Sequence, residues 1–87
     1  MARVKVKKVI DGDTFEDTRH SFFRLEGVDA PEKRERGYNK AKEALKNMID
    51  GEELIVKQVG ESYGRKVIEA RIPGEKTTIN TKMKRKT

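Results

Sequence analysis

The apolar residues of this chain are spaced for strands along most of its length and for a helix in one segment. Val4 and Val6 alternate with basic residues and lead into Val9-Ile10, a pattern that places apolar side chains on one face of a strand. Over residues 37–50 the spacing becomes helical, and the residues that carry it are Ala41, Ala44, Leu45, Met48 and Ile49. This change of period predicts a mainly β chain with one amphipathic helix that ends at Gly51.

Further short runs rich in β-branched and aromatic residues predict strands at 14–16, 22–25, 53–59 and 66–72. The Asp11-Gly12-Asp13 turn and the polar stretch 17–21 connect the first three strands into a meander, and residues 60–64 join the last two. Pro31 cannot donate to a ladder, so the third strand should stop near Val28 and a loop should follow.

Three strands in a meander, a helix and two more strands are the order of a five-stranded OB-fold barrel, although other small β-barrels share the pattern. We therefore predict an α+β, mainly β fold with one helix between strands three and four. The chain of 87 residues is long enough for one domain with a small core. We place this domain at 1–79, and we assign 80–87 to a basic C-terminal tail or the start of a truncated helix.

The charge balance favours a polyanionic partner. The chain has 21 Lys and Arg against 15 Asp and Glu, which gives a formal charge of +6. Such a charge attracts nucleic acid, although it also serves solubility in many proteins. The sequence contains no Cys, which excludes disulfides, thiolate catalysis and zinc sites built from Cys.

No apolar run approaches the roughly 20 residues of a membrane-spanning helix, and the alternating N-terminus lacks the apolar block of a signal peptide. We expect a cytoplasmic protein, with secretion of a processed form left open.

Four separated clusters carry the residue types that phosphodiester cleavage requires. They are Asp11-Gly12-Asp13-Thr14, Arg24-Leu25, Val28-Asp29-Ala30-Pro31-Glu32 and Tyr63-Gly64-Arg65. Phosphoryl transfer needs carboxylates to hold a divalent cation, cations to neutralise phosphate oxygens, and a carboxylate to manage the attacking water. Taken singly, each cluster has a simpler reading: an Asp-Gly turn, surface salt bridges, a carboxylate after a proline, or a packed aromatic.

In these motifs, their order and their spacing, the chain resembles the staphylococcal (micrococcal) nuclease family, also called thermonuclease-like or SNase-like domains, from about Val9 through Ile72. The resemblance implies that Asp13, Asp29 and the backbone carbonyl of Ala30 bind a calcium ion (Ca2+), for which hard oxygen ligands are suitable. It also implies that Glu32 is the general base, that Arg24 and Arg65 grip the scissile phosphate, and that Tyr63 contacts a substrate phosphate.

The activity that the resemblance implies is that of a calcium-dependent endonuclease that hydrolyses DNA or RNA, single-stranded or locally open, to 3′-phosphate products. The alternative is a non-catalytic nucleic-acid-binding OB-fold module. Basic residues that could guide a backbone, or could simply be solvated, are Lys5, Lys7, Lys8, Lys33, Arg34 and Arg36. His20 is expected to be an exposed turn residue.

The chain departs from the family pattern at its C-terminus, where the family continues through two more helices that cover the barrel. Only residues 79–84 are similar to the beginning of the next helix. We therefore expect either a minimal barrel or a homo-oligomer that associates through an uncovered apolar face of the barrel.

Overall fold

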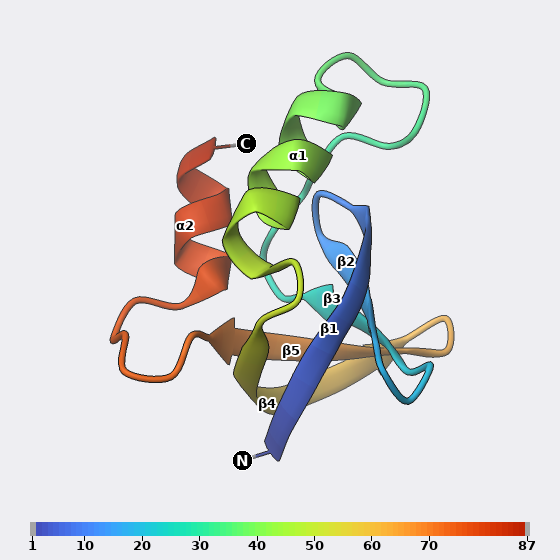
Figure 1. Cartoon of the computed structure of the whole chain (residues 1–87). Helices are drawn as coiled ribbons and strands as arrows, with labels where there is room; N and C mark the ends of the chain where they lie inside the picture. Colours follow the sequence, from blue (N-terminus) through green and yellow to red (C-terminus); the bar gives the residue numbers. More distant parts are fainter. Residues whose placement is uncertain (1, 87) are drawn as a thin grey trace.

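The computed structural model describes residues 2–86, which form five strands and two helices (Figure 1). The strands are β1 (Ala2–Asp11), β2 (Thr14–Asp17), β3 (Phe22–Leu25), β4 (Glu53–Ser62) and β5 (Arg65–Arg71). The helices are α1 (Tyr38–Ile49), between β3 and β4, and α2 (Ile79–Lys86), after β5. The strands close into a barrel in the order β1-β2-β3-β5-β4, so the predicted five-stranded, mainly β barrel is confirmed.

The barrel closes through pairings that differ in direction. β1 pairs antiparallel with β4 over Ala2–Lys5 and with β2 from Val6 onward. This one long strand therefore joins β4 to β2 and helps to close the barrel. β3 and β5 pair in parallel, and this pairing places Arg24 opposite Val67. All other strand pairs are antiparallel.

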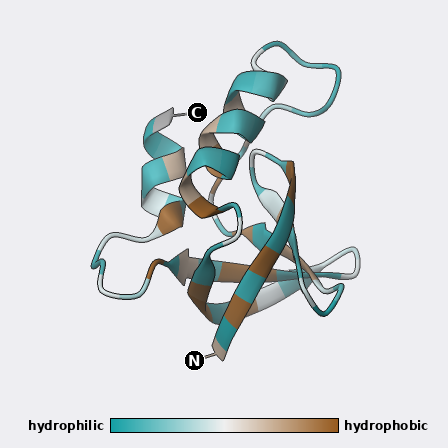
Figure 2. Ribbon diagram, in the orientation of Figure 1, coloured by the Kyte–Doolittle hydropathy of each residue, from teal (hydrophilic) through white to brown (hydrophobic). Residues whose placement is uncertain are grey.

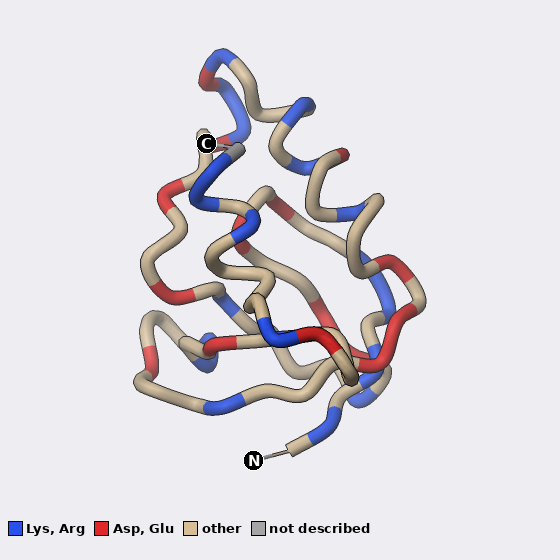
Figure 3. Tube along the Cα trace, turned by 90° about the vertical axis from the view of Figure 1, so that its left-hand side faces the viewer, with Lys and Arg blue, Asp and Glu red and all other residues tan. Residues whose placement is uncertain are grey.

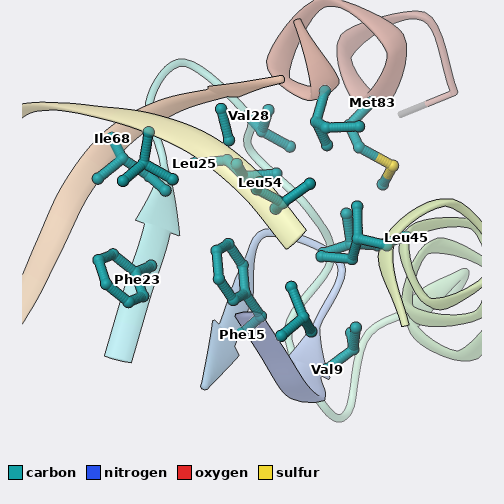
Figure 4. Close-up of a cluster of buried hydrophobic side chains, with 14 of the residues drawn as sticks. Val9, Phe15, Phe23, Leu25, Val28, Leu45, Leu54, Ile68 and Met83 are labelled. Carbon is teal, nitrogen blue, oxygen red and sulfur yellow. The ribbon is translucent and has the colours of Figure 1, made fainter. Parts of the chain in front are cut away.

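Alternation along the strands fills the barrel with apolar side chains. Figure 2 shows this alternation most clearly along β1. The rings of Phe15 and Phe23 stack with their centroids 5.2 Å apart. In Figure 4, Phe23 lies at one side of the core and Leu45 of α1 at the other, with Phe15 and Leu54 between them. The helix therefore closes one end of the barrel, and Phe23 lies toward the other end.

Helix α1 forms where the apolar period predicted it. It begins after Gly37, whose φ of 87° lies in the left-handed region that glycine adopts without strain. Ala41, Leu45 and Ile49 are its buried residues, and they form the stripe expected from the sequence.

Helix α2 corrects the prediction for the C-terminal segment, which we expected to be a tail or only the start of a helix. The hydroxyl of Thr78 accepts a hydrogen bond from the backbone N–H of Thr81 at 3.1 Å, so a capping side chain starts the helix. Ile79 and Met83 are fully buried against the core. Because most helical stability comes from tertiary packing, this short basic segment folds by burying these two residues, and it supplies apolar cover that we expected to be missing.

A buried asparagine joins α2 to the barrel. The side-chain oxygen of Asn80 accepts a hydrogen bond from the backbone N–H of Ala70 at 2.9 Å. Its amide group donates to the carbonyl oxygens of Glu26 and Ile68, each at 2.9 Å. Asn80 thereby links α2 to β5 and to the turn that follows β3.

Neither helix in the described part of the chain has the length and apolar character that crossing a membrane would require.

Candidate active site

The first part of the site is the β1–β2 turn, which lies against both α1 and the loop after β3. A Cβ atom built on Gly12 would lie 2.7 Å from the Cβ of Ala41 and 2.9 Å from the Cβ of Ala30. Only glycine permits so close an approach. It brings the Asp11-Gly12-Asp13 turn next to the segment that carries Asp29 and Ala30, as the predicted metal site requires.

The turn is also held by the first residue of α1. The hydroxyl of Tyr38 donates a hydrogen bond to the carbonyl oxygen of Ile10 at 3.0 Å. The pKa of Tyr38 is raised above its ordinary value, chiefly by a hydrogen bond to the neighbouring Asp11 carboxylate and secondly by burial. Asp11 therefore helps to place the turn, which agrees with the simpler structural reading of this residue.

The second part of the site is a cluster of two carboxylate oxygens, one hydroxyl and two guanidinium groups. Asp13 is buried, and its Oδ1 accepts a hydrogen bond from the hydroxyl of Thr14 at 2.9 Å. The same hydroxyl oxygen accepts a hydrogen bond from Nη1 of Arg65 at 3.3 Å. Nη2 of Arg24 lies 3.6 Å from Oδ2 of Asp13, close enough for an ion pair but not for a good hydrogen bond.

Strand register explains why these side chains meet. Thr14 of β2 is paired with Arg24 of β3, and Arg24 is paired with Val67 of β5. Because side chains two residues apart lie on the same face of a strand, Arg65 and Val67 share a face of β5. The barrel thus gathers Asp13, Arg24 and Arg65 from three separate segments, as predicted from the motifs.

The third part of the site is the loop from Val28 to Gly37. Nη2 of Arg24 is 3.4 Å from the carbonyl oxygen of Val28, which ties the beginning of the loop to the arginine. Ala30 is buried and Asp29 is exposed. Within residues 2–86 the Asp29 carboxylate forms no hydrogen bond or ion pair, so it is free to bind a ligand.

Glu32 is exposed in the same loop. Its backbone N–H donates to Oε1 of Glu35 at 2.8 Å, and its carbonyl oxygen accepts from the N–H of Glu35 at 2.8 Å. These two bonds fix the backbone of Glu32 and leave its carboxylate without a partner among the described residues. The structure therefore places Glu32 in the loop after β3 and does not bring its carboxylate into contact with Arg24 or Arg65.

Tyr63 lies at the tip of the β4–β5 hairpin. Tyr63 and Gly64 have φ values of 50° and 78°, the left-handed pair typical of a two-residue hairpin turn. The side chain of Tyr63 is 97% exposed, so its ring is not part of the core. It is a surface aromatic two residues before Arg65, and this position excludes the packing alternative considered for it.

The donor set suits a hard, weakly held cation. Among residues 2–86, no three His, Cys, Asp or Glu side chains gather into a metal site. The predicted set has only two carboxylates and one backbone carbonyl, and the remaining positions would be filled by water or substrate. The structure brings Gly12 close to Ala30 and leaves the carboxylate of Asp29 exposed.

Two contributors to this site were given no role by sequence reasoning. Thr14 is the hydroxyl bridge between Asp13 and Arg65, and its place beside Asp13 in the motif was the only available signal. Tyr38 holds the turn from a position 28 residues away, so nothing in the local sequence could indicate it.

No protein-family model matches the chain, and no match is found among curated proteins. The functional argument therefore rests on the geometry of the chain's own residues.

Proposed function

We propose that this protein is a calcium-dependent nuclease that hydrolyses phosphodiester bonds of DNA or RNA. The observation that carries the proposal is the convergence of two arginines on the hydrogen-bonded pair Asp13 and Thr14: Arg24 lies beside the Asp13 carboxylate, and Arg65 donates to the Thr14 hydroxyl. Two arginines beside a buried carboxylate form a place where an anionic group is stabilised while a cation is held next to it.

Arg24 and Arg65 would bind the scissile phosphate. The exposed fraction of the Arg24 side chain is 30%, so its guanidinium can leave the long contact with Asp13 and donate to phosphate oxygens. The planar guanidinium matches two oxygens at once, which a lysine does not do as well. Both arginines would stabilise the extra negative charge that develops as water attacks phosphorus.

Glu32 would accept the proton of the attacking water. The water oxygen forms the new bond to phosphorus, and the bond from phosphorus to the 5′ oxygen breaks. The products are a 3′-phosphate and a 5′-hydroxyl, which takes its proton from solvent. In the described structure the Glu32 carboxylate has no competing partner, so rotation of its side chain toward the phosphate breaks no existing bond.

Asp13, Asp29 and the carbonyl of Ala30 are the residues that would hold Ca2+. When bound, the ion would supply Lewis-acid stabilisation to the phosphate oxygens. Asp13 would keep its hydrogen bond with Thr14, which fixes the rotamer of the carboxylate.

The proposal also covers the fold family of the barrel. We assign it to the OB-fold type of the staphylococcal nuclease family, because its strand order and the site motifs agree with that resemblance. We place the protein in the cytoplasm, and we expect single-stranded or locally open nucleic acid as the substrate.

A non-catalytic nucleic-acid-binding module is the second candidate. Two observations favour it: Glu32 does not contact the arginine cluster, and the ring of Tyr63 is exposed and available to stack on a base. Such a module would bind nucleic acid through the same arginines and would need no ion.

Cleavage by single-residue variants separates the two candidates. We expect Arg65→Ala and Arg24→Ala each to lower the cleavage rate of single-stranded DNA on the order of 10²–10⁵-fold, the range for loss of a preorganised donor. Glu32→Gln should lower the rate while leaving binding of the uncleaved strand in EDTA unchanged.

The matched control is Arg85→Ala, which removes an exposed arginine of α2. A wild-type protein that is folded, binds the strand and does not cleave it in calcium would overturn the nuclease proposal and favour the binding module.

A further inference from the structure

A hollow of about 740 Å³ lies outside the arginine cluster, and none of the proposed catalytic or metal-binding residues lines it. The first residues of β1, the β2–β3 turn, the middle of β4 and the start of β5 surround it. Its apolar lining includes Phe23, Val56 and Ile68, which belong to the barrel core. Phe23 lies on the side of the core away from Leu45 of α1 (Figure 4), so the hollow is the mouth of the barrel that α1 does not close.

The rim of this mouth is basic. Its lining residues include five Lys or Arg and two Asp or Glu, whereas residues of both signs are mixed over the chain as a whole (Figure 3). The five basic residues are Arg3, Lys5, Arg19, Lys57 and Lys66. Such an excess around a concave surface focuses a positive potential into it.

The two carboxylates of the rim already have partners. Glu53 forms an ion pair with Arg3 at 3.1 Å. Asp17 accepts hydrogen bonds from the backbone N–H groups of Arg19 and Ser21 at 3.0 and 2.9 Å, which shapes the β2–β3 turn. Within residues 2–86, none of the remaining rim cations forms an ion pair with a carboxylate.

Strand geometry separates this mouth from the candidate active site. Arg65 and Lys66 are neighbours in β5, so their side chains leave opposite faces of the strand. Arg65 donates to Thr14 in the site, whereas Nζ of Lys66 lies 5.8 Å from the ring centroid of Phe23 in the mouth. The two surfaces are thus opposite sides of one strand.

We propose that this mouth is a second binding site, for a short segment of single-stranded nucleic acid. Phosphate groups would be neutralised by Lys5, Arg19, Lys57 and Lys66, which surround the hollow. The volume is suited to one or a few nucleotides and not to a duplex. The site goes beyond the proposed cleavage reaction, because binding here requires neither calcium nor Glu32.

The test is the salt dependence of binding of a fluorescent single-stranded oligonucleotide, measured by anisotropy in EDTA so that cleavage plays no part. The first protein is the triple variant Arg19→Gln, Lys57→Gln, Lys66→Gln. The matched control is Lys46→Gln, Lys76→Gln, Arg85→Gln, which removes the same charges from exposed positions outside the mouth.

We expect the mouth variant to lose at least about tenfold in affinity. For three lost phosphate contacts, the slope of log K against log salt should fall by about 2 in magnitude, since each contact to a single strand contributes roughly 0.7. The control should keep the slope of the wild type. Equal losses in the two variants would overturn the proposal, because the effect would then come from net charge alone.

A second measurement guards against misfolding of the mouth variant. Nuclear magnetic resonance of the wild-type protein should show shifted backbone amides at Thr18 and Gln58 when the oligonucleotide is added, and these shifts should persist in the Arg24→Ala, Arg65→Ala variant. Shifts confined to the arginine cluster would contradict a second site. Equal affinity for a nucleoside monophosphate, or for duplex DNA, would also overturn the assignment to a single strand.

These results are distinguishable from failure of the nuclease proposal. If the protein binds the strand through the mouth but does not cleave it in calcium, only the nuclease proposal fails. If the protein cleaves in calcium but the mouth variant binds as well as wild type, only the second-site proposal fails.

Discussion

At the scale of single residues, small contacts decide whether the site forms. Asp13 is positioned by the hydroxyl of Thr14, and its turn is positioned by the absence of a side chain at Gly12. The motifs named five charged residues for the site, and the structure brings three of them together, Asp13, Arg24 and Arg65, while the carboxylates of Asp29 and Glu32 contact neither arginine. The motifs did not predict Thr14 as the bridge or Tyr38 as the support, since both roles depend on distances that only the folded chain defines.

Gly12 provides the first prediction at this scale. Gly12→Ala should destabilise the protein by about 1–3 kcal/mol, because a Cβ would overlap the Cβ atoms of Ala41 and Ala30. It should also lower cleavage more than the stability loss explains, since it pushes the Asp13 turn away from Ala30.

Gly60→Ala is the matched control, because its added Cβ would meet Val67 only at 3.9 Å. Urea denaturation compares the two variants. Equal stability of Gly12→Ala and Gly60→Ala would show that the close approach is not a constraint.

A carboxylate of β2 provides a prediction on pH. Oε2 of Glu16 lies 3.0 Å from Nδ1 of His20, so the exposed turn histidine has a partner that we did not foresee. This hydrogen bond, helped by the charges of Lys7 and Lys8, lowers the pKa of Glu16 below its ordinary value, although burial opposes the shift. A carboxyl group whose pKa is lowered by folding adds stability above its unfolded-state pKa, and this contribution is lost as the pH falls through the folded-state pKa.

We therefore expect wild type to be more stable than Glu16→Gln near pH 6, and the difference to shrink as the pH falls below about 4. The measurement is the free energy of unfolding in urea at several pH values. Glu43→Gln, at an exposed position of α1, is the control and should show no such trend. A difference that grows on acidification would have the wrong sign for a lowered pKa.

At the scale of elements, α1 and most strands were predictable, whereas the sequence left the C-terminal segment open between a basic tail and the start of a truncated helix. The period of apolar residues defines α1 because its buried stripe is visible in the sequence. β4 continues three residues beyond its predicted end, to Ser62, since the hairpin turn needs only Tyr63 and Gly64. Helix α2 depends on the cap at Thr78 and on burial of Ile79 and Met83 against a barrel that no local pattern describes.

Asn80 is the residue on which docking of α2 depends most. Asn80→Ala should cost about 2–4 kcal/mol, because it leaves the buried N–H of Ala70 and the carbonyl of Glu26 without their partners. The carbonyl of Ile68 keeps a second hydrogen bond, from the N–H of Glu26, and should contribute less.

Asn80→Asp tests whether Asn80 stabilises the protein through its amide hydrogen bonds or only by filling the space between α2 and the barrel. It keeps the volume and the acceptor for Ala70 but turns a carboxylate oxygen toward two carbonyl oxygens, so it should be at least as destabilising. Asn47→Ala, at an exposed position of α1, should be neutral or slightly stabilising because alanine is the better helix former. Thermal unfolding gives all three values, and a neutral Asn80→Asp would contradict the role of the amide donors.

At the scale of the whole molecule, the barrel presents two cationic surfaces on opposite sides of β5. One contains Arg24 and Arg65 beside a buried carboxylate, and the other is the basic mouth around Phe23. Strand alternation predicted the strands and separates the two surfaces on β5, but the parallel pairing of β3 with β5 follows from closure of the barrel and is not visible in any single strand. The mouth escaped sequence reasoning because its basic residues come from four different strands and turns.

The most direct test of the central claim is end analysis of the products formed from a labelled single-stranded oligonucleotide with calcium or with EDTA. The account predicts fragments that carry a 3′-phosphate, removable by a phosphatase, formed only with calcium and lost in Arg24→Ala and Arg65→Ala but not in Arg85→Ala. Cleavage in EDTA, products with a 3′-hydroxyl, or no cleavage by the folded protein would contradict it.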